Sequence, residues 1–116
     1  MRVHVFAQNV ALAPSLSEFI ERRLGFALGR FASDVTRVVV RLQDMNGPRG
    51  GIDQRCRIDA SIAPCVLKTA EGKGANAEAA ICQAVNRIAS AVRRVLARRR
   101  VRGTRAARRS VTPALP

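Results

Sequence analysis

Hydrophobic and polar side chains alternate at the start of the chain, and this period of two is typical of a half-buried strand. In residues 2–7, RVHVFA, the side chains of Val3, Val5 and Ala7 share one face. The same alternation recurs in VTRVVVRLQDM (35–45), DQRCRIDASI (53–62) and VLKTAEG (66–72) and predicts three further strands. The inward positions that it predicts in the second and third strands are Val38, Val40, Leu42, Cys56, Ile58, Ala60 and Ile62.

Two segments carry apolar residues at intervals of three and four, which predicts amphipathic helices. In the first, within residues 11–31, Pro14 suits the opening turn. Gly25 and Gly29, four residues apart, would let a neighbouring element approach this helix closely. The second helix follows Asn76, a suitable N-cap. The apolar stripes are Leu16, Ile20, Leu24, Ala27, Leu28 and Phe31 in the first helix and Ile81, Ala84, Val85, Ile88, Val92 and Val95 in the second.

The order strand, helix, three strands, helix predicts an α+β fold, β-α-β-β-β-α. We expect one domain, with a four-stranded mixed sheet and both helices packed on one face. The connection through the first helix makes the first two strands parallel if they are neighbours. The other links are short, and NGPRGG (46–51) is rich in turn residues, so the remaining pairs should be antiparallel.

Arginine dominates the end of the chain. Residues 79–116 contain ten arginines and no acidic residue, whereas residues 1–78 contain eleven basic and eight acidic residues. Arg99 falls on the apolar stripe, where a charge is costly to bury, so the second helix should leave the sheet near Ala97 or end there. We therefore predict an α/β domain over residues 1–100 and a basic, disordered tail over residues 101–116.

The uneven charge favours a polyanionic partner, with nucleic acid ahead of an anionic membrane surface. The sequence has no apolar run of about 20 residues that could span a membrane. The start of the chain does not resemble a signal peptide, and three packed cysteines without C-x-x-C spacing suit a reducing cytoplasm. The absence of tyrosine and tryptophan argues against a stacking platform for single strands and favours contacts to the backbone of folded RNA.

Few residues could carry catalysis. His4 is the sole histidine, so Cys56 and Cys82 have no base to activate them, and a zinc site is disfavoured. Glu18 and Glu21 lie at ion-pair spacing beside an arginine rather than as an acid and base pair. We predict that the protein is not an enzyme and has no cofactor, metal site or small-molecule substrate.

One glycine-rich segment, EGKGAN (71–76), precedes the second helix. Free N–H groups at a helix start can hold a phosphate. The segment lacks the spacing of a nucleotide-binding loop, however. We interpret it as a strand-to-helix loop, with a contact from Lys73 to an RNA phosphate as the alternative.

The basic side chains form the candidate RNA-binding site. If the two helices lie side by side, a positive ridge would run across both. Arg87, Arg94 and Arg98 share one flank of the second helix at helical spacing, and Arg93 lies on the opposite flank. The candidate contacts are Arg22, Arg23, Arg30, Lys73, Arg87, Arg93, Arg94 and Arg98 in the domain, and Arg102, Arg105, Arg108 and Arg109 in the tail.

Two segments resemble the ribosome hibernation promoting factor family, which includes the ribosome-associated inhibitor called protein Y. The first, NVALAPSLSEFIERRL (9–24), matches the family at Pro14, Leu16, Phe19, Ile20, Glu21 and Leu24. The second, NAEAAICQAVNRIASAVRRVL (76–96), matches at Ala79, Ala80 and Ile81 and continues into a basic helix, as the family does. The chain differs where the family has two Asp, a Tyr and a frequent basic residue, at Asn76, Cys82, Glu78 and Ser90 respectively.

The resemblance covers residues 1–98 and implies a cytoplasmic translation inhibitor. A member of this family would bind the rRNA of the small ribosomal subunit in the decoding channel, as a monomer when bound. It would block the mRNA and tRNA sites under stress by occupancy. The alternatives are a general module for structured RNA or DNA and a regulatory protein–protein module.

Overall fold

The fold was derived from a computed structural model that describes residues 1–8, 10–44 and 54–111, with the side chains of 100–111 left out of the description. NGPRGG therefore lies outside the described residues. The elements are β1 (Arg2–Gln8), α1 (Pro14–Leu28), the 3-10 turn η1 (Gly29–Phe31), β2 (Val35–Asp44), β3 (Gln54–Ile62), β4 (Val66–Gly74) and α2 (Ala77–Val111).

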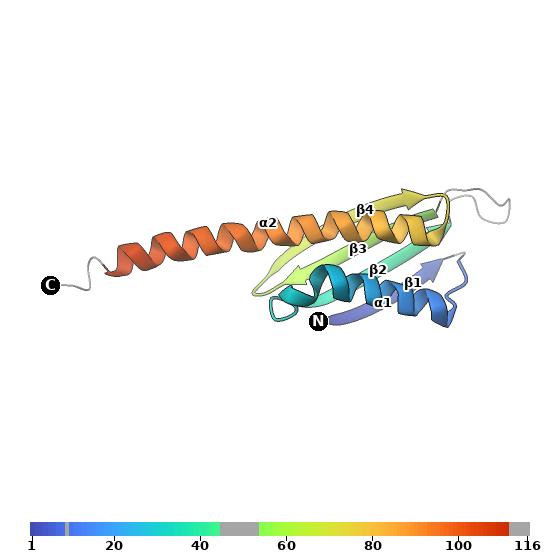
Figure 1. The fold of residues 1–116 in the computed structure, drawn as a ribbon, viewed down its shortest axis with the longest axis horizontal. Coiled ribbons are helices and arrows are strands. Elements are labelled where there is room, and N and C mark those ends of the chain that lie inside the picture. Colours follow the sequence, from blue (N-terminus) through green and yellow to red (C-terminus); the bar gives the residue numbers. More distant parts are fainter. Residues whose placement is uncertain (9, 45–53, 112–116) are drawn as a thin grey trace.

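The four strands form one sheet in the order β1-β2-β3-β4. β1 pairs with β2 in parallel, and the β2–β3 and β3–β4 pairs are antiparallel. Both helices cover the same face of this sheet (Figure 1). The predicted α+β architecture and the strand directions are therefore confirmed.

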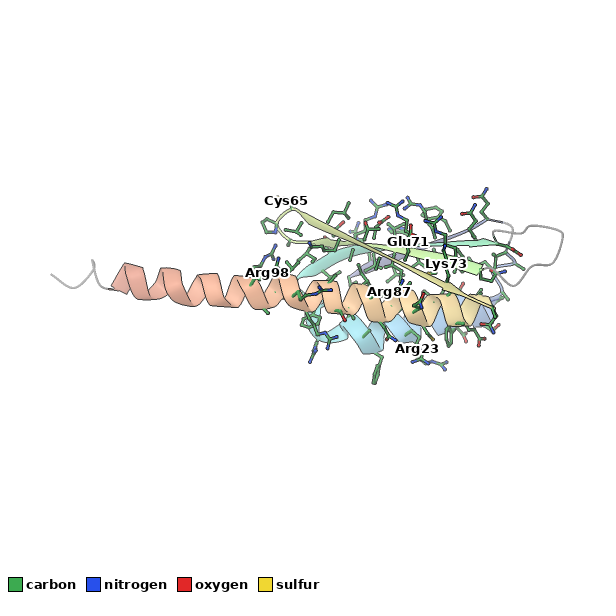
Figure 2. The ribbon with its side chains drawn as sticks, turned by 90° about the horizontal axis from the view of Figure 1, so that it is seen from above. Arg23, Cys65, Glu71, Lys73, Arg87 and Arg98 are labelled. Carbon is green, nitrogen blue, oxygen red and sulfur yellow. The ribbon has the colours of Figure 1, made fainter. Side chains whose placement is uncertain are left out.

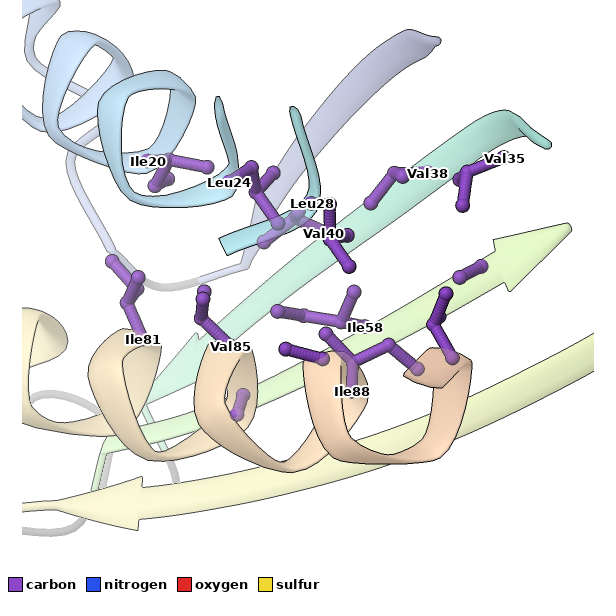
Figure 3. Close-up of a cluster of buried hydrophobic side chains, with 14 of the residues drawn as sticks. Ile20, Leu24, Leu28, Val35, Val38, Val40, Ile58, Ile81, Val85 and Ile88 are labelled. Atoms are coloured by element: carbon purple, nitrogen blue, oxygen red, sulfur yellow. The ribbon is translucent and has the colours of Figure 1, made fainter. Parts of the chain in front are cut away.

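The core lies between the sheet and the two helices (Figure 3). Every inward position predicted for the two middle strands is buried, and Ile58 at the centre is fully enclosed. α1 contributes Ile20, Leu24 and Leu28 to this core. Burying one such aliphatic side chain stabilises the folded state by about 1.5–3 kcal/mol. The inward side chains of the strands and the apolar stripes of the helices therefore together stabilise the packing of the helices on the sheet.

Local signals set the helix starts. Pro14 occupies the first turn of α1, as predicted. The Asn76 side-chain oxygen accepts a hydrogen bond of 2.8 Å from the backbone N–H of Ala79, which confirms the predicted N-cap. α1 is shorter than the predicted helix because its last turn tightens into η1.

The glycines that allow a close approach are not the predicted ones. A Cβ added at Gly25 or Gly29 would meet nothing within 4 Å, so the prediction of a close neighbour on α1 is wrong. Gly72 and Gly74 lie in β4 instead, directly under the first turns of α2. A Cβ at Gly74 would lie 2.6 Å from the Cβ of Ala79. These two glycines let the strand and the helix touch through their backbones.

α2 extends well beyond the sheet (Figure 1). Leu96 is the last buried residue among the described side chains, and Arg99 is partly exposed. Of the two predicted outcomes, the helix therefore leaves the sheet instead of ending near Ala97. It continues to Val111, so residues 101–111 are helical where a disordered tail was predicted. Alanine and arginine are both good helix formers, which favours this continuation.

Candidate nucleic-acid interface

α1 and α2 lie side by side, and a groove runs between them. One part of the groove, of about 450 Å³, is lined by Phe26, Ala27, Arg30, Asn86, Ala89, Ser90 and Arg93. The adjoining part, of about 320 Å³, is lined by Arg30, Phe31, Arg93, Leu96 and Ala97. Arg30 and Arg93 line both parts, and neither lining contains an acidic residue.

Contacts within the protein hold both arginines at the groove. The Arg30 guanidinium carbon lies 4.7 Å from the centre of the Phe31 ring, a stacked cation–π arrangement. Arg93 donates a hydrogen bond of 3.1 Å to the hydroxyl of Ser90. A guanidinium presents several N–H donors in a plane that matches a phosphate. The groove therefore offers two oriented anion-binding groups, Arg30 from η1 at the end of α1 and Arg93 from α2.

The exposed surface of α1 adds two of the predicted arginines. Arg22 and Arg23 are both exposed, and Arg23 lies over the ring of Phe19 at 5.5 Å. The predicted ion pairs from Glu18 and Glu21 to Arg22 do not form within 4 Å among the described residues. All three side chains extend into solvent, where such pairs contribute little.

The other flank of α2 covers the free edge of β4. Arg87 donates a hydrogen bond of 2.7 Å to the carbonyl oxygen of Glu71. The Gln83 side chain accepts one of 2.8 Å from the backbone N–H of Lys73. Figure 2 labels Arg87 and Glu71 where α2 passes along β4. Arg87 therefore supplies a hydrogen-bond partner to a backbone carbonyl of the edge strand β4. The sequence alone did not indicate this structural role.

The structure divides the predicted RNA contacts into two groups. It brings Arg30 and Arg93 together at the groove, and it sets Arg87 and Lys73 apart at the edge of β4. Arg94 bonds the Ser90 carbonyl at 3.3 Å, and at helical spacing Arg98 shares its flank. Arg102, Arg105, Arg108 and Arg109 belong to the helical extension, whose side chains are outside the description. The RNA-binding role of all of these residues stays a prediction.

Phe26 is the groove residue that the sequence analysis missed. Its side chain is 92% exposed, the highest value among the large apolar residues described. Phe26 lies off the apolar stripe, four residues from both Arg22 and Arg30. Because side chains four residues apart are neighbours on a helix, this spacing could have identified Phe26 as part of the basic surface. An exposed aromatic ring among arginines can stack on an unpaired base.

Alternative chemistry finds little support in the fold. Residues 71–74 belong to β4 rather than to a loop, and the glycines there allow α2 to pack closely on the strand. Burial raises the pKa of the Cys56 thiol to about 12, which keeps it protonated. Cys65 is exposed and Cys82 partly so; the prediction of three packed thiols is correct only for Cys56.

The described residues contain no group of three or more side chains that could together hold a metal ion. None of the helices within that part of the chain is both long enough and apolar enough to cross a membrane.

The sequence from residue 3 to residue 100 matches the family described as sigma 54 modulation protein / S30EA ribosomal protein. The fold is similar to the crystal structure of the N-terminal domain of Protein Y from Thermus thermophilus. That match has a TM-score of 0.70 and 21% identity, and it covers 82% of this chain and 99% of the other. A ribosomal subunit interface protein from Coxiella burnetii matches with a TM-score of 0.70 and 11% identity, covering 84% and 99%. At these identities the two structures establish likeness of fold. No curated protein sequence matches significantly.

Proposed function

The chain belongs to the sigma 54 modulation protein / S30EA ribosomal protein family, and from this premise we propose that it binds the small ribosomal subunit and inhibits translation. In this proposal it occupies the decoding channel and blocks the mRNA and tRNA sites under stress. The observation that carries the proposal is the pairing of Arg30 and Arg93 across a groove free of acidic residues. The names of the two similar structures, Protein Y and a ribosomal subunit interface protein, support the ribosome as the partner.

The proposed mechanism needs no covalent chemistry. Arginines on both helices neutralise rRNA phosphates and release the counterions that surround the RNA. A rigid pair of helices suits the shape of folded RNA, which proteins recognise mainly through its backbone and grooves. Inhibition then follows from occupancy, because the bound protein excludes the RNAs that use the same channel. The protein would act in the cytoplasm as a monomer on each subunit, without a cofactor.

Binding to the small subunit should be strongly salt-dependent. With six or more phosphate contacts, affinity should fall about 1,000-fold or more between 50 and 200 mM salt. The measurement is cosedimentation of the full chain with purified subunits across this range. Failure to cosediment at roughly 100 mM salt would contradict the proposal, since specific binding should persist there. Full transfer of the protein to excess duplex RNA would instead favour a general RNA-binding module.

Replacing Phe26 with alanine should weaken subunit binding about 5-fold or more, because stacking of a base on an aromatic ring contributes about 1–3 kcal/mol. The thermal midpoint should hardly change, since the ring is 92% exposed and supports no core contact. Phe26→Leu is the matched control, because it keeps an apolar side chain and removes only the aromatic ring. Equal affinity of the wild type and Phe26→Ala would show that no base stacks at this position.

A further inference from the structure

Among the described residues, no helix or strand packs on the face of the sheet opposite α1 and α2 (Figure 1), which we call the open face. The strand register arranges the side chains of this face in rows. One row runs across all four strands from β1 to β4 and consists of Phe6, Arg41, Arg57 and Glu71. The neighbouring rows are His4, Val39, Asp59 and Thr69 on one side and Gln8, Gln43, Arg55 and Lys73 on the other. The last row is Arg2, Arg37, Ser61 and Leu67.

All six cations of this face lie directly opposite another cation on the adjacent strand. The pairs are Arg2 with Arg37, Arg41 with Arg57, and Arg55 with Lys73. Like charges directly opposite one another destabilise a sheet. A face that keeps three such pairs is suited to a partner that supplies negative charge.

Two carboxylates offset only part of this charge. Asp59 accepts hydrogen bonds from Arg41 at 2.7 Å, from Arg57 at 3.4 Å and from Thr69 at 2.6 Å. Partial burial raises the pKa of Asp59, but the Thr69 hydrogen bond and the two arginines outweigh it and hold that pKa below its usual value, so Asp59 is ionised at neutral pH. Glu71 pairs with Arg55 at 2.5 Å.

The remaining cations of the face have no such partner. Among the described residues, the side chains of Arg2, Arg37 and Lys73 make no ion pair. Six cations against two carboxylates leave the face strongly positive, independently of the arginines on the helices.

A hollow and an aromatic ring lie next to each other on this face. The hollow has a volume of about 210 Å³ and is lined by Gln8, Arg41, Gln43, Arg55, Arg57 and Glu71. Phe6 lies beside Arg41 in the same row and is 54% exposed. The Arg41 guanidinium carbon is 6.0 Å from the centre of its ring. The hollow thus offers guanidinium and amide donors, while Phe6 offers a flat apolar surface.

We propose that the open face of the sheet binds single-stranded RNA, with phosphates on the arginine rows and a base stacked on Phe6. An unpaired base is required, because a base inside a duplex cannot reach an exposed ring. Four-stranded sheets with exposed aromatic residues bind single strands in this way in other proteins. The exposed Phe6 ring can supply the stacking surface that was not expected in a chain without tyrosine and tryptophan. The site is distinct from the helical groove, so the proposal goes beyond the function given above.

The test is fluorescence anisotropy of a labelled single-stranded RNA of about 12 nucleotides, within the range that one compact domain covers. The first variant is Arg2→Gln with Arg37→Gln. These two arginines lie directly opposite each other on β1 and β2, and neither makes an ion pair among the described residues. It should bind the RNA more weakly, and the slope of log K against log salt should shrink by about 1.4, the value for two phosphate contacts to a single strand. Its thermal midpoint should stay the same or rise, because a repulsion is removed.

Phe6→Ala should weaken binding of the same RNA about 5-fold or more. Arg30→Gln with Arg93→Gln removes the same two charges from the helical groove, and it should weaken binding of the short single strand less than Arg2→Gln with Arg37→Gln does. The proposal is overturned if the wild type does not bind the oligonucleotide, or if only the groove variant loses binding. Equal competition by a polyglutamate peptide would also overturn it, because charge alone would then explain the affinity. Since the assay contains no ribosomes, its failure leaves the subunit cosedimentation unaffected.

Discussion

Replacing Arg30 and Arg93 together with glutamate is expected to lower affinity for the small ribosomal subunit about 100-fold or more. Each charge-assisted hydrogen bond contributes about 1.5–3 kcal/mol, and two of them would be lost. The new carboxylates would also repel the phosphates that the arginines had attracted. The two residues line both parts of the interhelical groove, so the change is concentrated at one site. The measurement is cosedimentation or competition binding at fixed salt.

The matched control is Arg2→Glu with Arg37→Glu, on the opposite face of the sheet. It changes the net charge by the same amount, so it separates the effect of location from that of total charge. Both variants should fold, because all four side chains are exposed. A loss of similar size in both would show that the groove is not the subunit-binding site and that net charge governs the interaction.

The fold was predictable from the sequence because the local signals agree with the tertiary structure. The alternation in residues 35–45 and 53–62 set the buried face of the central strands, and Val38, Val40 and Ile58 are fully buried there. Asn76 and Pro14 fixed the helix starts. Connection lengths then determined which strands run parallel. Each of these signals acts within a few residues along the chain, where sequence patterns are most informative.

The site was only partly predictable, because it depends on which flank of a helix meets which neighbour. Helical spacing correctly placed Arg93 and Arg87 on different flanks of α2. It could not indicate that α1 lies beside Arg93 and that β4 lies beside Arg87. Arg87 therefore stays a predicted RNA contact, and the structure adds its hydrogen bond to the edge strand β4. The like-charge pairs on the open face were equally hidden, because they depend on the register between strands.

Gly72→Ala is expected to destabilise the fold by about 3 kcal/mol, at the upper end of the usual cost of overpacking. The added Cβ would overlap the carbonyl oxygen of Ala80 and lie 2.5 Å from the backbone nitrogen of Ala84. Both contacts are backbone atoms of α2, so no side chain can rotate away and the helix itself must move. Since 1 kcal/mol lowers the midpoint of a domain of this size by about 4–8 °C, thermal unfolding will show the change clearly.

Gly25→Ala is the control, and its effect should have the opposite sign. Gly25 is exposed within α1, and an added Cβ would meet nothing within 4 Å. Alanine there should stabilise the helix by about 1 kcal/mol, the difference between the two helix propensities. An unchanged midpoint for Gly72→Ala would mean that α2 does not rest on β4 as described. Displacing α2 would also move Arg93 away from Arg30. The Gly72→Ala variant should therefore lose subunit affinity along with stability, although its net charge and the residues that line its groove are the same as in the wild type.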